Sequence, residues 1–566
     1  MSGGLAGQPR LDDDVADAAG TSPVAGDAVV DHGAGEAQPA IVSASDIFAA
    51  TATASAESAR GLRRFALRHP RVSVWIVLLL ILGLWGTWAG PGWNPQPMQS
   101  LIVPERADTA ITTQWETPAL GSYQVTSELT EVTLHDGVVV PATIRRPAGF
   151  EGSAPGVLFI HGTGTDSHTN FEREAAALTS AGIVTIVPDK RTTDYTTTHR
   201  DYPALANDYE DVFADLLTRP GVDARHSGIY AVSEGCFIAP IIAARNSQVG
   251  FVALISAPVL PIREQGAMAA DTYLRNLGAP ERFIGVIPRL VGQDFGADTF
   301  KYIDFDVSKY QRQMDMPVLM LYGTGDMSMP TIQGPQILRD DLARNGNHDV
   351  TVRYYGGADH GLQVDGILVS DAMRDTSDWV NGLPYTADSR PHIAGMQPTQ
   401  TYQAGSVGQP HWFASGPFAV WTFIVGLVLT LAGIVLTILG AIRIRSWRLW
   451  DFRGCGPTVS FASLAVILAW VAALTYVGAV AMLALSYQQN RLIVQGGWIA
   501  VQAVAFIAAW MVVRVPFAWH AAHYPKDGSQ THALSGLANV IVVVSFFGQL
   551  SLLFALGYWG FYPSIV

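Results

Sequence analysis

Five long runs of apolar, uncharged residues divide the chain of 566 residues. One run lies near the N-terminus and four follow one another toward the C-terminus: 72–89, 417–441, 459–486, 494–513 and 536–558. A helix of about 18 residues reaches roughly 27 Å, which is close to the hydrocarbon thickness of a bilayer. The pattern therefore predicts five membrane-spanning helices, because four such runs in succession are not typical of buried helices in a soluble domain.

The segment before the first run has a different character. Residues 1–58 are rich in Ala, Gly, Ser and Asp and have no apolar periodicity, which predicts a disordered tail. Four arginines then precede the run, and we interpret 72–90 as a retained signal anchor. A cleaved signal peptide is the alternative, but the preceding tail is far too long for a signal n-region.

The distribution of basic residues predicts the orientation of the five helices. Four arginines (Arg443, Arg445, Arg448 and Arg453) lie between the second and third runs, Arg491 alone lies between the third and fourth, and Arg514 and Lys526 follow the fourth. Basic residues favour the cytoplasmic side. We therefore expect a cytoplasmic N-terminus, an extracytoplasmic region from 91 to 416, and a multi-pass protein of the cell membrane.

Amide side chains occur in the last two runs: Gln495, Gln502, Asn539 and Gln549. They could line a polar path, but amides in such helices more often hold helices together. No Asp, Glu, Lys or Arg lies inside the five runs, which argues against an ion or proton transporter.

The region between the first two runs alternates short apolar strands with helical stretches. Two strand-like segments, 123–134 and 138–145, flank Asp136-Gly137, a hairpin signal. Further strands are expected at 156–160, 183–188, 227–232, 251–256, 317–322 and 350–355. This order predicts an α/β domain over about 100–390, with a mostly parallel sheet covered on both faces.

Composition and charge narrow the class of function. The chain is 49% hydrophobic and 15% charged, with a net charge of −13 that argues against nucleic-acid binding. Its two cysteines, Cys236 and Cys455, would lie on opposite sides of the membrane and cannot form a disulfide framework.

The strand that ends at Val232 runs into Ser233-Glu234-Gly235 and then a helical stretch. A strand, a sharp turn of small residues and a helix form a nucleophile elbow, which lifts the serine hydroxyl above the sheet edge. The strand that ends at Ile160 leads into His161-Gly162-Thr163-Gly164. The backbone amides of Thr163 and Glu234 are the candidates for an oxyanion hole.

An aspartate and a histidine follow the last two predicted strands. Asp326 comes after the strand that ends at Tyr322, and His360 comes after the strand that ends at Tyr355. The order Ser233, Asp326, His360 is the chain order of an α/β-hydrolase triad. Histidine would take the serine proton, and the aspartate would fix its tautomer.

These motifs resemble the α/β-hydrolase superfamily over roughly 120–385. Ser233-Glu234-Gly235 with Ile238-Ala239-Pro240 is similar to the elbow of bacterial serine esterases related to dienelactone hydrolases and acyl-aminoacyl-peptidase-like proteins. Asp189-Lys190-Arg191 resembles a segment that follows a core strand in those esterases. The chain departs from the pattern at Ala231 and Cys236, which replace two glycines of the elbow.

Other residues compete for these roles. Cys236 could be a nucleophile, although a buried packing role is favoured, and Asp359 could replace Asp326 as the acid that orients His360. His168 and His199 lie in polar loops without metal-ligand spacing, so they are interpreted as solvated, and no cofactor or metal is expected.

Residues 258–316 are too long for a plain connection between two strands, and we expect a helical cap over the serine. A linker at 391–416 and a four-helix membrane domain at 417–566 complete the predicted organisation. We expect a membrane-anchored, carboxylesterase-like serine hydrolase that cleaves an ester, with lipids and acylated envelope compounds among the candidate substrates. Peptidase activity, acyl transfer by the same triad, and a non-catalytic assembly subunit remain open, and the sequence names no protein partner.

Overall fold

The computed structural model describes residues 59, 63–294, 299–444, 447–448, 450–452, 454–486, 488–524 and 534–562. The predicted disordered tail at 1–58 lies outside these residues. The chain divides into two units, Met1–Arg68 and His69–Val566. The second unit contains the sheet and all five long apolar helices.

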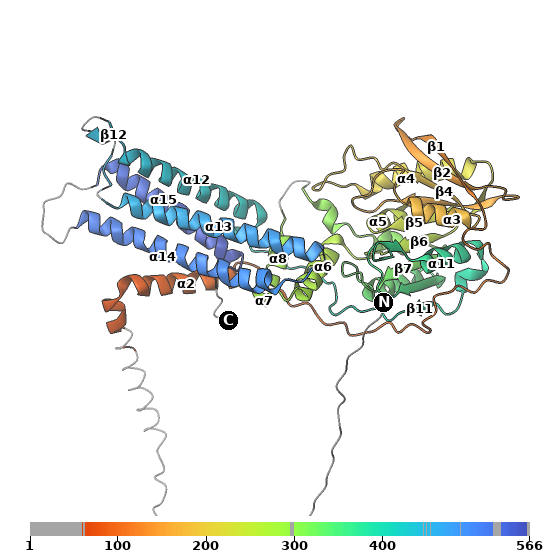
Figure 1. Ribbon diagram of the computed structural model, residues 1–566, viewed down its shortest axis with the longest axis horizontal. Coiled ribbons are helices and arrows are strands. Elements are labelled where there is room, and N and C mark those ends of the chain that lie inside the picture. The colour runs from red at the N-terminus through yellow and green to blue at the C-terminus, as the bar shows by residue number, and fades with distance from the viewer. Residues whose placement is uncertain are drawn as a thin grey trace, which may run out of the picture. The chain divides into compact units, whose positions relative to one another are not determined.

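A nine-stranded sheet forms the centre of the α/β domain (Figure 1). Its spatial order is β1-β2-β4-β3-β5-β6-β7-β8-β11, and the strands from β4 through β11 pair in parallel. The strand bounds are β1 Val125–Thr133, β2 Val139–Pro147, β3 Ala154–Ile160, β4 Val184–Pro188, β5 Val222–Val232, β6 Val252–Ile255, β7 Val318–Gly323, β8 Val350–Tyr355 and β11 Ile393–Gly395.

Helices cover both faces of this sheet. Helices α3 (Glu172–Ser180) and α11 (Ser370–Asn381) pack on one face, where Phe159 and Leu319 point. Helices α4 (Tyr202–Thr218), α5 (Gly235–Arg245) and α10 (Gln333–Ala343) pack on the other, where Leu158 and Met320 point. Neighbouring residues of one strand thus enter opposite cores, as the pleat of a strand requires. The arrangement confirms the predicted α/β-hydrolase fold.

Every strand predicted from the apolar runs is present, and the Asp136-Gly137 turn connects the antiparallel pair β1 and β2. The edge strand β11 was not predicted, because three residues are too few to show an alternating pattern. It lies in the segment 391–416 that was expected to be a linker, and Ile393 pairs with Val352 of β8. Met98 also donates a backbone hydrogen bond of 3.0 Å to Thr401, so this segment packs along the domain.

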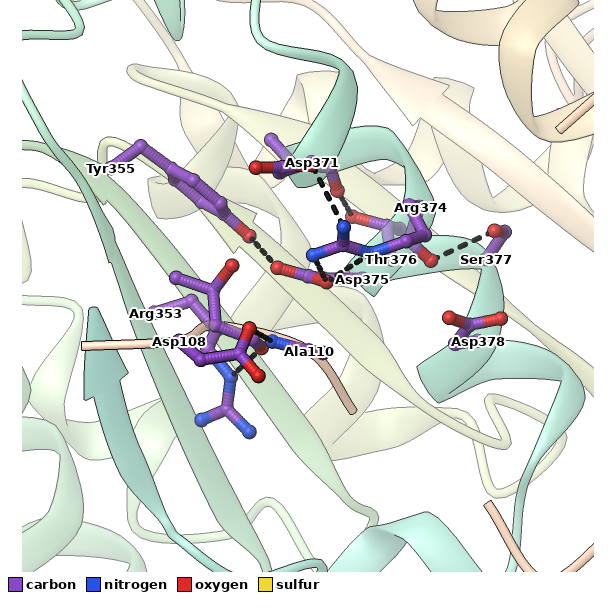
Figure 2. A network of polar contacts seen from close by, with 12 residues as sticks. Asp108, Ala110, Arg353, Tyr355, Asp371, Arg374, Asp375, Thr376, Ser377 and Asp378 are labelled. Atoms are coloured by element: carbon purple, nitrogen blue, oxygen red, sulfur yellow. Dashed lines mark hydrogen bonds and ion pairs between the residues drawn. The ribbon is translucent and has the colours of Figure 1, made fainter. Parts of the chain in front are cut away.

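A buried polar network holds α11 against β8 (Figure 2). The Tyr355 hydroxyl donates to Asp375 over 3.0 Å, and Arg374 donates to the other oxygen of the same carboxylate over 2.7 Å. Arg353 is fully buried, and its guanidinium donates to the backbone oxygen of Thr109 over 2.7 Å. The network fixes the last core strand, whose C-terminal end leads toward the candidate histidine.

The insertion between β6 and β7 forms a group of short helices. They are α6 (Ile262–Asn276), α7 (Glu281–Ile284), α8 (Ile287–Val291), η1 (Lys301–Asp304) and α9 (Ser308–Gln311). Gln265 of α6 donates to the backbone oxygen of Ser328 over 2.6 Å, and Tyr302 of η1 donates to Thr197 over 2.9 Å. The insertion therefore contacts loops that follow β7 and β4.

Among the residues that the structure describes, five helices are long and apolar enough to cross a membrane. They are α2 Pro70–Trp88, α12 Gly416–Ala441, α13 Gly456–Leu485, α14 Gly497–His523 with a π-helical turn at Leu492–Gly496, and α15 Gly536–Tyr558. The chain is therefore a candidate multi-pass membrane protein. Helix α14 continues ten residues past the predicted end at Val513 and includes Arg514 and Pro516.

The apolar helices pack side by side (Figure 1). Small residues and amides contribute to this packing. A Cβ atom added at Gly433 of α12 would lie 2.2 Å from Ser545 of α15, so only glycine fits this approach. Gln549 is buried and donates to Ser463 of α13 over 2.8 Å, and Trp519 donates to Asn539 over 3.0 Å. In these contacts, amide side chains hold neighbouring helices together, which is the role expected of amides in membrane helices.

The insertion packs directly on the apolar helices. The ring of Phe283 in α7 lies 5.1 Å from that of Tyr476 in α13 and 5.8 Å from that of Trp498 in α14. Gln495 donates to the backbone oxygen of Gly278 over 3.4 Å. The insertion of the α/β domain thus packs against α13 and α14. The sequence did not predict this contact.

Candidate active site

Ser233 stands at a sharp turn between β5 and α5. Its φ angle is +54°, a left-handed conformation that non-glycine residues rarely adopt. A Cβ atom added at Gly235 would lie 2.7 Å from the Ile160 carbonyl oxygen, so the turn needs glycine there. Strained backbone at a strand–helix turn is characteristic of a nucleophile elbow. Ala231 replaces the first glycine of the elbow pattern. Its methyl group is fully buried in the core, so the fold accommodates it.

The loop after β3 passes beside this turn. A Cβ atom built on Gly162 would lie 3.2 Å from the Cβ atom of Ser233 and 3.8 Å from its Oγ. Within the described part of the chain, the backbone amides of Thr163 and Glu234 donate to no other group. Two free amide donors next to a serine hydroxyl can receive the negative oxygen of a tetrahedral intermediate.

His360 and Asp326 form the second half of the candidate site. His360 Nδ1 lies 2.8 Å from Asp326 Oδ2, and the carboxylate of Asp326 is buried. Ser328 supports the other oxygen, to which its backbone N–H donates over 2.8 Å and its hydroxyl over 2.6 Å. The carboxylate is therefore fixed from both sides, which orients the imidazole.

Ser233 and His360 are both anchored at the C-terminal end of β6. The Ser233 backbone N–H donates to Ile255 over 2.9 Å, and the hydroxyl of the next residue, Ser256, donates to the backbone oxygen of His360 over 2.8 Å. The two residues therefore flank the same strand end. Three predicted residues from distant parts of the sequence, Ser233, Asp326 and His360, are brought to one edge of the sheet.

Two competing assignments find other roles in this geometry. Asp359 accepts backbone N–H bonds from Gly361 and Gln363, both over 2.9 Å, and so stabilises its own turn. Cys236 is buried in α5 and its thiol donates to the Ala231 oxygen over 3.3 Å. Burial raises the pKa of Cys236, which keeps it a thiol and disfavours nucleophilic attack.

The side chain of Glu234 joins a buried ionic network that the sequence analysis did not identify. Its carboxylate accepts from Lys190 over 2.9 Å, from Tyr195 over 2.6 Å and from Tyr202 over 3.1 Å, and it also pairs with Arg200. Burial alone would raise the pKa of Glu234, but the charges of Lys190 and Arg200 outweigh it and the pKa is lowered. The carboxylate is therefore ionised and fully paired.

This network reaches the glycine-rich loop. Lys190 also donates to the Gly162 oxygen over 3.2 Å, and Arg200 donates to the Thr163 hydroxyl over 3.2 Å. The network therefore fixes the two segments that carry the candidate oxyanion amides. Lys190 follows β4 directly, so the same strand-end rule that located Asp326 could have drawn attention to it. Arg200 lies further along the loop and Tyr202 begins α4, and neither position gave such a signal.

Two electrostatic features of the histidines matter for chemistry. His161 lies buried between the Tyr209 hydroxyl at 2.8 Å and the Ser167 oxygen at 3.1 Å, and burial lowers its pKa to about 4. It is a neutral support for the loop. Burial opposes protonation of His360, but the hydrogen bond and charge of Asp326 prevail and raise its pKa.

The other polar histidines are not grouped as metal ligands. His168 Nδ1 lies 2.7 Å from Asp189 Oδ1, and the backbone N–H of His199 donates to Thr196 over 3.0 Å. Among the described residues, no group of three or more His, Cys, Asp or Glu side chains is arranged to hold a metal ion.

Comparisons with solved structures find similarity at low sequence identity over about half of the chain. No family model and no curated protein matches the sequence. Among solved structures, a dienelactone hydrolase from Anabaena variabilis is 19% identical, with a TM-score of 0.31 over 45% of this chain and 97% of that chain. An esterase from Pyrococcus furiosus is 16% identical, with a TM-score of 0.33 over 49% and 97%. Brefeldin A esterase, a bacterial homologue of human hormone sensitive lipase, is 16% identical, with a TM-score of 0.33 over 55% and 86%.

Proposed function

We propose that the protein is a membrane-anchored serine hydrolase that cleaves an ester through an acyl-enzyme intermediate. Ser233 is the nucleophile, His360 the general base and Asp326 the orienting acid. The observation that carries the proposal is the left-handed backbone of Ser233 beside the Gly162 loop. A strained backbone of this kind costs free energy, and such strain is often found at active sites. Here it would present the serine hydroxyl to a substrate.

The proposed reaction gives each residue of the candidate site a role. His360 Nε2 takes the hydroxyl proton as Ser233 Oγ attacks the ester carbonyl carbon, while Asp326 holds Nδ1–H and stabilises the imidazolium. The carbonyl oxygen becomes negative and accepts hydrogen bonds from the amides of Thr163 and Glu234. His360 then returns the proton to the leaving alkoxide, and an acyl-Ser233 ester remains. Water, deprotonated by His360, attacks that ester and releases the acid.

The distribution of arginines in the sequence supports a substrate on the outer side of the membrane. The arginine clusters of the sequence favour a cytoplasmic N-terminus and an extracytoplasmic α/β domain. Two contacts support the assignment of the insertion as the cap of the site. The insertion binds Ser328 on one side and the loop that contains Thr197 on the other. Its contact with α13 and α14 keeps the domain near the bilayer, which raises the effective concentration of a membrane-borne ester.

Turnover by the full-length protein in vesicles tests this function. A panel of short-chain esters, lipid esters and matching amides should show ester cleavage that is lost in Ser233→Ala. Ser127→Ala, on the exposed side of β1, is the matched control and should retain full activity. Equal turnover by Ser233→Ala and the unaltered protein would refute the proposed nucleophile, and cleavage of amides alone would indicate a peptidase.

A further inference from the structure

A cavity of about 330 Å³ lies among the apolar helices, away from the residues of the candidate active site. Helices α2, α12, α13 and α15 contribute walls, and residues of the insertion close one side. Trp85, Gln293, Ala419, Trp470, Ala555 and Tyr558 are among its lining residues. The volume exceeds the roughly 150 Å³ of an apolar cavity that accepts benzene and falls in the range of ligand sites.

The walls of the cavity exclude charged ligands. No Asp, Glu, Lys, Arg or His lines it among the described residues, and most of its surface is aromatic or aliphatic. Arg289 lies nearby, but it pairs with the backbone oxygen of Tyr558 and does not line the cavity. Transfer of an ion into such surroundings is costly, whereas an alkyl chain gains free energy there. The cavity therefore fits a hydrocarbon chain.

Two polar atoms at this cavity have no partner. Gln293 is 3% exposed, and its Nε2 donates to the Tyr558 hydroxyl over 2.8 Å and to Ala414 over 3.2 Å. Its Oε1 accepts nothing, and Nε1 of Trp85 donates to nothing. Buried polar atoms without partners are destabilising, so each calls for an explanation. The Gln293 atom is an acceptor and the Trp85 atom is a donor, and both residues line the cavity.

We propose that this cavity binds the chain of a neutral lipid that bears a hydroxyl group. The hydroxyl donates to Gln293 Oε1 and accepts from Trp85 Nε1, and the chain occupies the apolar walls. The surrounding helices are the predicted membrane spans, so the bilayer itself supplies the ligand. The site does not depend on hydrolysis at Ser233, and it stands or falls separately from the proposed function.

Photolabelling of the full-length protein tests the site. The probe is a long-chain primary alcohol with a diazirine in its chain, incorporated into phosphatidylethanolamine–phosphatidylglycerol vesicles. We expect adducts on residues that line the cavity, with labelling that saturates and is displaced by the unmodified alcohol. The corresponding fatty acid should displace it less well, because its carboxylate must be buried. Better displacement by the fatty acid would overturn the assignment of a neutral hydroxyl lipid.

Three variants separate the cavity from general lipid contact. Ala419→Phe fills the cavity and should abolish saturable labelling, whereas Ala481→Phe, on an exposed face of α13, should leave it unchanged. Trp85→Phe removes the donor and keeps the ring, so it should weaken displacement by the alcohol about five-fold, as expected for one hydrogen bond. Displacement by the corresponding alkane should not change. Thermal unfolding establishes that each variant is folded. Equal labelling of Ala419→Phe and Ala481→Phe, or adducts spread over lipid-facing positions, would contradict the site.

Discussion

Ser233 has a left-handed backbone although serine carries a Cβ atom, and the surrounding residues hold it there. Gly235 and Gly162 leave room for the close approach of β3, β5 and the loop between β3 and α3. In the proposed mechanism, the general base His360 depends on its pairing with Asp326, whose carboxylate has no contact with solvent. Single substitutions at this pair are therefore informative.

Replacement of Asp326 by asparagine should reduce kcat by about 10⁴-fold, because an amide favours the wrong imidazole tautomer. Asp359→Asn is the matched control. Its carboxylate stabilises a turn and does not contact Nδ1, so kcat should fall far less. Ester turnover by the purified variants measures both effects. A larger loss from Asp359→Asn than from Asp326→Asn would reverse the assignment of the orienting acid.

The pH dependence follows from the raised pKa of His360. Only the neutral imidazole accepts the serine proton, so activity should appear as the pH rises through a pKa above the ordinary value of 6.5. Loss of the carboxylate in Asp326→Asn should move this midpoint downward. The same raised pKa makes the pair stabilise the fold below the ordinary histidine pKa, and this contribution disappears as the pH rises through the folded value. Initial rates from about pH 5 to about pH 9 locate the midpoint, and a midpoint that is unchanged by Asp326→Asn would disprove the coupling.

At the scale of elements, the predictable part of the molecule is the set of strand ends. Long apolar runs located β3 to β8. The rule that functional residues gather at the carboxyl ends of parallel strands gave Ser233, Asp326 and His360 as candidates. Contacts between loops were not predictable, because the four partners of Glu234 are spread over 190–202 and meet it only in the folded chain. The edge strand β11 and the contact of the insertion with α13 and α14 were not predictable either, because both depend on tertiary packing.

The Glu234 network gives a prediction about loop stability. Glu234→Gln leaves the buried charges of Lys190 and Arg200 without their counter-charge, which should cost about 3–5 kcal/mol of unfolding free energy. The lowered pKa of Glu234 implies that this contribution is present above the ordinary glutamate pKa and is lost as the pH falls through the folded value.

Surface charge provides the control for this prediction. Glu210→Gln breaks an ion pair with Arg245 that is partly exposed, and it should cost no more than about 1 kcal/mol. Adding Lys190→Met to Glu234→Gln should recover part of the lost stability. Chemical denaturation of the four proteins measures these differences. Equal losses for Glu234→Gln and Glu210→Gln would show that the network does not hold the loops.

At the scale of the whole molecule, the protein combines an α/β-hydrolase domain with five apolar helices, and the insertion joins the two. A single helix would tether the domain, whereas the helices also provide a surface for Phe283 and a cavity beside Gln293. A membrane-borne substrate then requires that the domain lie on the expected side.

Cysteine accessibility in intact cells tests the orientation. Gln409→Cys, at an exposed position before α12, should react with a membrane-impermeant thiol reagent, and Ser43→Cys in the N-terminal tail should react only after the membrane is opened. The native cysteines, Cys236 and Cys455, are buried and contribute little background. The reverse pattern would place the α/β domain in the cytoplasm and exclude an extracytoplasmic substrate.

The central claim is that Ser233, activated by His360, is the nucleophile of the membrane protein. The most direct measurement is the reaction of the full-length protein in membranes with a fluorophosphonate, followed by peptide mapping of the adduct. The account predicts one phosphonylated residue, Ser233, with labelling abolished by Ser233→Ala and slowed strongly by His360→Ala. An adduct on another residue, or undiminished labelling of Ser233→Ala, would contradict it.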